Sequence, residues 1–226
     1  MITQLKASDT FIKVITRVKK VRAIILCEGA RDTEVLKAVA RRLNLVKELE
    51  NVAVTDAEGI DTLTKEMLPT IIKLMVVKVI SRPKPIAMVV DADDVKPEVK
   101  VRSIVDGLKS KLQSNGAEVH GKICDNVWRI VVKRGSEEIP ILVAVNGVFE
   151  EPFTAFILHE LEDHIVYLKL LENRLVRDSF PRGGRARELV IEEDFELLDN
   201  AERVHVEKAF KHLVCLLQIL TALIQA

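Results

Sequence analysis

The sequence predicts an α/β protein with a mostly parallel central sheet flanked by helices, followed by an α-helical C-terminal extension. Between residues 20 and 112, short apolar runs alternate with longer segments in which apolar residues recur every three or four positions. That β-α-β-α-β-α order is the one expected of a parallel sheet with helices on its faces. Hydrophobic residues make up 48% of the 226-residue chain and charged residues 30%, which is typical of a globular protein with a substantial core.

Three βα units account for the first half of the chain. Apolar runs predict strands at residues 23–27, 51–55 and 86–91. Helical spacing predicts helices at residues 32–43, 61–80 and 99–112. Pro69 lies inside the second of these helices, and its missing N–H should kink that helix or split it in two. Residues 11–22 fit a strand and a helix equally well.

A hairpin and one further strand follow. Residues 118–124 and 127–133 flank an Asp125-Asn126 turn, a pattern typical of a β-hairpin. Residues 139–145 form another apolar run with the length of a strand. Because the two strands of a hairpin are antiparallel, the sheet is predicted to be mixed.

Beyond residue 150 the pattern becomes helical. Apolar residues of the last helix recur at intervals of four and three, which makes a coiled-coil-like seam of Val206, Phe210, Leu213, Leu217, Leu220 and Ile224. Such a seam fits packing on the parent domain; the alternative is a homodimer or larger complex through residues 206–224. We divide the chain into a basic N-terminal segment (1–19), an α/β domain (20–150) and a helical extension (151–226).

The cysteines and the apolar runs favour a cytoplasmic protein. Cys27, Cys124 and Cys215 are odd in number and lack any CxxC pairing, which predicts reduced thiols rather than a disulfide framework or a zinc site. The first nine residues contain no apolar core of a signal peptide. The longest apolar run, residues 213–224, is too short to span a membrane.

Basic side chains gather locally, although the formal net charge of the chain is zero. Residues 1–22 hold six Lys and Arg against one acid, and residues 174–187 hold five Arg against one acid. The Arg-rich loop could meet phosphates of a nucleic acid; a solvated surface is the alternative. The candidate nucleic-acid-binding residues are Arg182, Arg185 and Arg187 in this loop, with Lys133 and Arg134 at the end of a strand.

Two of the predicted strands end in carboxylates. Glu28 follows the strand at 23–27, and Asp91 and Asp93 stand at the end of the strand at 86–91. The carboxyl ends of parallel strands meet at one edge of the sheet, where ligands bind. In extended geometry Asp91 and Asp93 point to the same side. Clustered carboxylates repel one another unless a cation neutralises them, so these three acids predict a site for Mg²⁺ or Mn²⁺.

At these residues the chain resembles the Toprim family, which includes topoisomerases, bacterial primases, OLD-family nucleases and RecR-like repair proteins. The family pattern is a strand ending in Glu-Gly, often with an Asp shortly after, and then a strand ending in Asp-x-Asp. Residues 25–32 and 89–94 match that pattern, and the match covers residues 20–150. The resemblance implies a compact Rossmann-like sheet that binds Mg²⁺ or Mn²⁺ and cleaves, rejoins or extends strands of DNA or RNA.

The same resemblance implies roles for individual residues. Glu28 would act as general acid/base or metal ligand, while Asp91 and Asp93 would hold the metal. Small OLD-like members also carry a Glu-Asp pair on a helix after the sheet. The additional candidate acids are therefore Asp32, Asp94, Glu162 and Asp163. Because the chain has only Tyr167 on a helix and no separate tyrosine-bearing domain, topoisomerase activity is not expected, and hydrolysis by a nuclease is the expectation.

Two other functions stay open at this point. Residues 89–95 also fit the haloacid-dehalogenase phosphatase signature, in which Asp91 would accept the phosphoryl group and Asp93 would act as acid/base. That signature normally opens its fold, whereas here two βα units come first. The other alternative is a Toprim-like scaffold that binds nucleic acid or a protein partner without cutting. His159 and His164 are five apart rather than four, so a helical zinc-protease motif is excluded.

Overall fold

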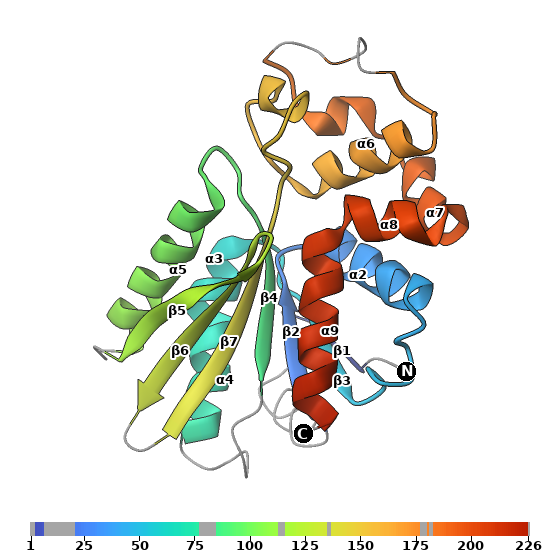
Figure 1. Cartoon of the computed structure of the whole chain (residues 1–226). Helices are drawn as coiled ribbons and strands as arrows, with labels where there is room; N and C mark the ends of the chain where they lie inside the picture. The colour runs from blue at the N-terminus through green and yellow to red at the C-terminus, as the bar shows by residue number, and fades with distance from the viewer. Residues whose placement is uncertain are drawn as a thin grey trace.

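The computed structural model describes residues 3–6, 21–76, 85–112, 116–134, 137–176, 180 and 183–225. A mixed sheet runs through the centre of this part of the chain (Figure 1). Its strands are β1 (Thr3–Lys6), β2 (Ala23–Cys27), β3 (Val52–Asp56), β4 (Ile86–Asp91), β5 (Ala117–Cys124), β6 (Val127–Arg134) and β7 (Glu137–Asn146). They are ordered β1-β3-β2-β4-β7-β6-β5. The pairs from β1 to β7 are parallel, and the β7–β6 and β6–β5 pairs are antiparallel, so the predicted mixed α/β sheet is confirmed.

Helices cover both faces of the sheet (Figure 1). On one face lie α3 (Ile60–Thr62), the π-helical turn η1 (Leu63–Met67), α4 (Leu68–Val76) and α5 (Pro97–Leu112). On the other face lie α2 (Ala30–Arg42) and α9 (Lys211–Gln225). Beyond the carboxyl ends of β2, β4 and β7 lie η2 (Phe153–Ala155), α6 (Leu161–Leu171), η4 (Ala186–Leu189), α7 (Glu193–Asn200) and α8 (Arg203–Ala209).

The central strands are apolar throughout because both of their faces are covered. In β2, Ile24 and Leu26 pack with residues of α4 and α5, whereas Ile25 and Cys27 pack with residues of α2 and α9. All four side chains are buried. A strand buried on both faces has no polar alternation, which explains the continuous apolar runs in the sequence. The first polar residue after each run therefore marks the edge of the sheet.

Pro69 disrupts the helix predicted over residues 61–80, as expected. The short helix α3 gives way to the π-helical turn η1, and α4 begins at Leu68, directly before Pro69. Because proline has no N–H to donate into the preceding turn, the regular hydrogen-bond ladder shifts at this point. Residues 77–80 of the predicted helix lie outside the described residues. So does the predicted basic segment 1–19, apart from β1.

The apolar seam of the last helices packs on the parent domain. Val206, Phe210, Leu213, Leu217 and Leu220 are fully buried against α2 and the neighbouring face of the sheet. These side chains are therefore not available for the homodimer considered from the sequence, because the chain's own core already occupies the seam. Among the described helices, none has the length and apolarity needed to cross a membrane.

The prediction that all cysteines are reduced is wrong for two of them. Cys124, at the end of β5, forms a disulfide with Cys215 on α9, and their Cα atoms are 6.8 Å apart. Cys27 is a buried thiol in β2. The odd number of cysteines gave no information about pairing, because the packing of α9 on the sheet brings together two residues that are 91 positions apart.

Replacing both Cys124 and Cys215 by serine should lower the free energy of unfolding by about 4 kcal/mol, because the disulfide closes a loop of 91 residues in the unfolded chain. For a chain of this size, the loss corresponds to a fall in Tm of about 8–16 °C in non-reducing calorimetry. A reducing agent should lower the Tm of the wild type similarly and leave the double variant unchanged. If the Tm of the wild type does not change with the reducing agent, and the denatured protein shows three titratable thiols, the disulfide is contradicted.

Candidate functional site

The carboxylate-bearing ends of β2 and β4 meet at the topological switch point of the sheet. β2 and β4 are neighbours, with Cys27 opposite Val89 in the register. The helix after β2, α2, covers one face of the sheet, whereas the helix after β4, α5, covers the other. A crevice at such a switch point is the usual ligand-binding position of an open α/β sheet. Glu28 follows β2 and Asp91 closes β4, so these two acids share the edge that the sequence predicted.

Glu28 is fixed against the end of β4. The backbone N–H of Asp91 donates to Oε2 of Glu28 at 3.2 Å. The Glu28 main chain is held as well, since its N–H donates to the Val89 carbonyl at 3.0 Å and its carbonyl accepts from the Gly59 N–H at 2.8 Å. The carboxylate of Glu28 is thus placed directly beside the carboxyl end of the neighbouring strand.

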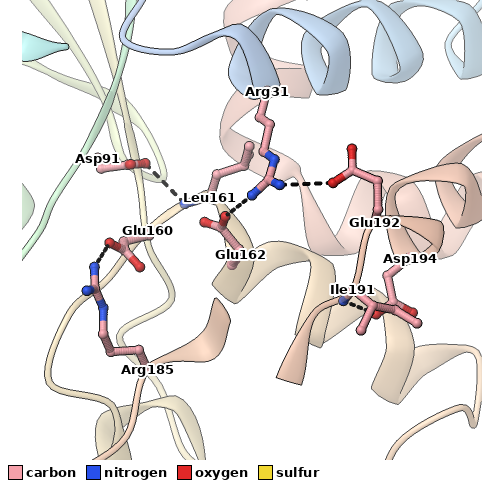
Figure 2. A network of polar contacts seen from close by, with 9 residues as sticks. All are labelled: Arg31, Asp91, Glu160, Leu161, Glu162, Arg185, Ile191, Glu192 and Asp194. Atoms are coloured by element: carbon pink, nitrogen blue, oxygen red, sulfur yellow. Dashed lines mark hydrogen bonds and ion pairs between the residues drawn. The ribbon is translucent and has the colours of Figure 1, made fainter. Parts of the chain in front are cut away.

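Asp91 is held by two donors on a single oxygen. Asn146, the last residue of β7, donates from Nδ2 to Oδ1 of Asp91 at 2.9 Å. The N–H of Leu161 donates to the same oxygen at 3.1 Å (Figure 2). Leu161 is the first residue of α6, so the Asp91 carboxylate lies at the positive end of that helix dipole.

Asp32 is joined to Asp91 through Asn146. One carboxylate oxygen of Asp32 accepts from the Gly29 N–H at 2.8 Å, which closes the first turn of α2. The other oxygen accepts from Nδ2 of Asn146, also at 2.8 Å. A single amide nitrogen therefore bridges the buried carboxylate of Asp32 and the half-buried carboxylate of Asp91, which come from different elements.

Glu162, in the first turn of α6, completes a group that we call the acidic cluster: Glu28, Asp32, Asp91 and Glu162. Arg31 of α2 reaches Glu162 at 3.5 Å and Glu192 at 2.9 Å, as Figure 2 shows. Its guanidinium also lies over the ring of Phe195, 5.2 Å from the centroid. Because 55% of the Arg31 side chain is exposed, this cation lies at the solvent side of the cluster.

Burial, followed by repulsion between neighbouring carboxylates, raises the pKa of every acid in the cluster. For Asp32, burial is the largest cause and the charges of Glu28 and Glu162 add to it, so that its pKa rises to about 7. The pKa of Asp91 is raised well above its usual value, first by burial and then by the charge of Asp32. The hydrogen bonds from Asn146 act in the opposite direction on both aspartates. The cluster therefore favours the binding of protons or of a cation.

The chemistry of these donors suits a hard divalent cation. Carboxylate oxygens are the preferred protein ligands of Mg²⁺, and the repulsion among them is what a bound cation would relieve. Across the described ranges, no three His, Cys, Asp or Glu side chains already stand in a metal-ligand arrangement. The residues therefore fit the ion in type and charge, and side-chain rotation would have to accompany its binding.

The extended geometry from which Asp91 and Asp93 were expected to share one side does not continue past β4. β4 ends at Asp91, and Asp93 has a left-handed backbone with φ 60°, so the extended geometry on which that expectation rested has ended. The main chain of Asp93 pairs with His159, and its carboxylate forms an ion pair with Lys100 of α5. Asp93 still acts on Glu28, since its charge contributes to raising the pKa of that acid. Asp94 is exposed.

The remaining candidate acid, Asp163, serves to join neighbouring segments. It is fully buried, accepts from the Val148 N–H at 3.0 Å, and lies 2.8 Å from Nδ1 of His159. These contacts attach α6 to the chain that leaves β7. Asp163 and Glu162 are adjacent in sequence, but a helix directs neighbouring side chains about 100° apart, so only Glu162 belongs to the acidic cluster.

The candidate basic residues are divided between two edges of the sheet. Arg185 forms an ion pair with Glu160, the residue before α6, and so lies near the acidic cluster (Figure 2). Arg187 is exposed in η4. Lys133 pairs with Glu118 at 2.9 Å and is opposite Glu138, at the start of β7. Because β6 is antiparallel, its carboxyl end lies at the edge away from the cluster, so Lys133 does not reach the site. Arg182 and the side chain of Arg134 lie outside the described residues.

Several residues of the site were missed in the sequence. Asn146 ends a strand that is parallel to β4, just as Asp91 does, and that position was a usable signal. His212 lies 2.9 Å from Asn146, and it interrupts an apolar helix that otherwise predicts only packing. Arg31 and Lys100 were hidden among the many charged residues of α2 and α5. No local pattern separates these two from solvated surface charges.

The part of the chain that carries the site matches a family model. Residues 22–166 match the model of a family described as a protein of unknown function, DUF3226. The chain belongs to this family. The matched part of this DUF3226 protein contains the whole acidic cluster and Asn146, whereas His212 lies beyond it. No protein with a curated description matches the sequence.

Solved structures with a similar fold are distant in sequence. The DUF3226 protein is similar to a hypothetical protein from Pyrococcus horikoshii OT3, with a TM-score of 0.54 and 14% identity over 91% of this chain and 97% of that chain. This likeness shows the fold alone. The C-terminal region of the OLD protein from Xanthomonas campestris pv. campestris gives a TM-score of 0.41 and 15% identity, over 92% of this chain and 96% of that chain. The same region of the Burkholderia pseudomallei OLD protein gives 0.41 and 14%, over 90% and 98%. With TM-scores below 0.5, we draw no conclusion about this chain from the two OLD regions.

Asp32 should make the stability of the metal-free DUF3226 protein fall as pH rises from about 4 to about 7. Its pKa is about 7 in the folded chain against 3.8 without the fold, so between these values only the folded chain holds the proton. The free energy of unfolding then decreases with pH, by a total on the order of a few kcal/mol. Asp32→Asn removes this contribution, and its Tm relative to wild type should rise by several degrees between pH 4 and 7.5.

The variant comparison cancels the titrations that do not depend on Asp32. The pKa of Asp91 falls when the charge of Asp32 is removed, which adds to the same relative rise of Tm with pH. Buried His164, whose pKa is lowered to about 4, and His212 act in the opposite sense, but they do so in wild type and variant alike. Glu34→Gln, on the exposed side of α2, should follow the wild type at every pH. Parallel curves of Tm against pH for Asp32→Asn and wild type would contradict the prediction.

Proposed function

We propose that this protein is a Mg²⁺- or Mn²⁺-dependent enzyme that hydrolyses phosphodiester bonds in nucleic acid. The observation that supports this most strongly is the meeting of Glu28, Asp32, Asp91 and Glu162 at the switch point of the sheet. The Toprim-like motifs around Glu28 and Asp91 support the same reaction class. The description of the family names no activity, so the proposal rests on the site and the motifs.

Glu28 and Asp91 would hold the ion, with Asp32 and Glu162 beside them. When bound, a divalent cation supplies charge stabilisation at a phosphoryl oxygen and lowers the pKa of a bound water. Asp93 fits the family motif in sequence, but its ion pair with Lys100 gives it a different setting. We therefore expect Asp93 to contribute less to metal binding than the motif alone implies.

The protein's own groups position the site and exchange protons. Burial raises the pKa of Glu28, which brings its carboxyl closer to the range where it can take up and release a proton near neutral pH. The Asp91 N–H fixes the carboxylate that would do so. Asn146 and the first turn of α6 fix Asp91 in turn. Glu28 is thus the best placed acid/base of the cluster.

Arg31 is the best placed contact for a phosphate. Its guanidinium is more than half exposed and lies between Glu162 and Glu192, at the rim of the cluster. Arginine offers several donors in a planar fork that matches phosphate oxygens. A phosphodiester chain that replaces the carboxylate of Glu192 as partner of Arg31 would be brought beside Glu28 and Asp91. Arg185, which pairs with Glu160 directly before α6, and the exposed Arg187 of η4 would extend this contact.

The nuclease proposal is tested with labelled single- and double-stranded DNA and RNA in the presence of Mn²⁺. Glu28→Gln and Asp91→Asn should each reduce cleavage by a factor on the order of 10²–10⁴, because each removes a carboxylate that no neighbour replaces. Asp94→Asn, an exposed acid three residues from Asp91, is the matched control and should cleave like wild type. Asp93→Asn should lose less activity than Asp91→Asn.

Other outcomes of this assay decide against hydrolysis. A wild type that is inert on every substrate but binds one of them would favour the non-catalytic scaffold. If cleavage persists in both Glu28→Gln and Asp91→Asn, the activity belongs to another site of the protein or to a contaminating nuclease. Hydrolysis of a generic phosphomonoester, lost with Asp91→Asn and kept with Glu28→Gln, would favour the phosphatase reading of residues 89–95.

Mn²⁺ should stabilise the folded protein more at pH 8 than at pH 5.5, because a carboxylate must lose its proton to bind a cation. At a concentration about 100 times the dissociation constant, the gain is about 2.7 kcal/mol, or a rise in Tm of roughly 5–10 °C. Asp91→Asn should abolish the rise, and Asp94→Asn should keep it. An equal rise for wild type and Asp91→Asn at matched ionic strength would exclude a metal site in the cluster.

A further inference from the structure

A buried amide–imidazole pair lies directly behind the acidic cluster. Asn146 is fully buried and bridges Asp32 and Asp91 through its amide nitrogen. At the other end of the same amide, Oδ1 of Asn146 lies 2.9 Å from Nε2 of His212, which is 1% exposed. His212 belongs to the first turn of α9, so a helix from the end of the chain contacts the amide that holds the two aspartates together.

Hydrogen bonds fix the Asn146 amide from both ends. When Asp32 and Asp91 are ionised, as cation binding requires, they can only accept, so the NH₂ group of Asn146 faces them and its oxygen faces His212. That oxygen also only accepts, and His212 must therefore donate through Nε2–H. The other ring nitrogen, Nδ1, then carries no proton in the neutral ring. Burial lowers the pKa of His212 well below its usual value, which keeps the ring neutral.

A second histidine holds the first in place. The ring of His164 stacks on that of His212 with centroids 4.2 Å apart. His164 is itself bonded at both nitrogens: Nδ1–H donates to the Ala209 carbonyl at 2.8 Å, and Nε2 accepts from the Gly147 N–H at 2.9 Å. It thus links the end of α8 to the residue that follows Asn146. The position of His212 relative to Asn146 is fixed from two sides.

His212 carries an energetic cost that packing does not explain. Its Nδ1 is buried and has no hydrogen-bond partner. An unsatisfied buried polar atom destabilises the fold, and an apolar side chain of similar size at this position would avoid that loss. The neighbouring positions of α9 that face the core, such as Leu213 and Leu216, are apolar. What the histidine adds is the N–H that faces Asn146.

We infer that His212 is a positioning residue that orients the Asn146 amide, so that a single nitrogen holds the Asp32 and Asp91 carboxylates side by side for a divalent cation. This inference rests on the function proposed above. Without the Nε2–H donor, the amide loses the contact that fixes its rotation. A rotated amide would set its oxygen against the carboxylates, which repel it, and the two aspartates would separate. Groups that orient metal ligands in this way affect metal affinity without touching the ion.

Three variants of α9 separate orientation from packing. His212→Gln places an amide N–H at a reach similar to that of the imidazole Nε2 and should restore the donor. His212→Met fills the space with an unbranched apolar side chain and removes the donor. Leu213→Met, at the next position, is the control for a conservative change in the same buried layer. Asn146→Ala removes both bridging hydrogen bonds and serves as the second test if His212→Met does not fold.

The first measurement needs no metal. Crystal structures of the variants without added ions should show Asn146 bonded to Asp32 and Asp91 in His212→Gln and Leu213→Met, but turned away from at least one of them in His212→Met. The second is the Mn²⁺ dissociation constant from calorimetry. It should rise 10- to 100-fold in His212→Met and Asn146→Ala, and stay within about threefold of wild type in His212→Gln and Leu213→Met.

The outcomes distinguish this inference from the proposed function. If wild type binds no Mn²⁺, the proposed function fails, and the metal-free structures alone then decide whether His212 orients Asn146. If His212→Met keeps both aspartate bonds, or binds Mn²⁺ as tightly as wild type, the positioning role is overturned. The same holds if His212→Gln loses as much affinity as His212→Met, because that result indicates a packing role rather than a donated hydrogen bond.

Discussion

The close approach of partly buried carboxylates at the switch point is the constraint on which the rest of this structure depends. Like charges in such a place raise one another's proton affinity, and the fold must hold them together against that repulsion. It does so with neutral donors: the Asn146 amide, the N–H at the start of α6, and the N–H of Asp91. These donors fix the carboxylates without neutralising them. Under the proposed function, a bound cation would relieve the repulsion that remains.

The two cations nearest the cluster are placed at its margins. Lys100 is paired with Asp93 on the α5 side, and Arg31 is shared between Glu162 and Glu192 on the α2 side. Neither cation lies between Asp32 and Asp91, where the repulsion is strongest. A cation between the two aspartates would have offset their repulsion. In the proposed function, the centre of the cluster would take the ion and the rim would meet the phosphodiester.

Most of the fold and about half of the site follow from the sequence. Apolar runs buried on both faces, helical spacing and the Asp125-Asn126 turn predicted the strands, the hairpin and the mixed sheet, because each depends on local chemistry. Glu28 and Asp91 were placed at the shared edge of the sheet for the same reason: each is the first charge after a buried strand. The pairing of Asp93 with Lys100 was not predicted, because the left-handed backbone of Asp93 ends the alternation that a strand would have continued.

What the sequence could not provide depends on contacts between distant segments. Asn146 and His212 become partners only because α9 packs against the end of β7, and Cys124 meets Cys215 through the same packing. A lone histidine in an apolar helix and an odd number of cysteines have many local explanations. Neither pattern identifies its partner before the tertiary arrangement is known.

The position of α9 also means that the boundary of the family match is not the boundary of a folding unit. The matched region ends at residue 166, yet one face of the sheet is covered by a helix that begins at residue 211 and is covalently tied to β5. A chain shortened to the matched region would keep every carboxylate of the cluster. It would expose the apolar face now buried by Leu213, Leu216, Leu217 and Leu220, which favours aggregation. The last helix is therefore part of the minimal module, although it contributes no residue to the motifs.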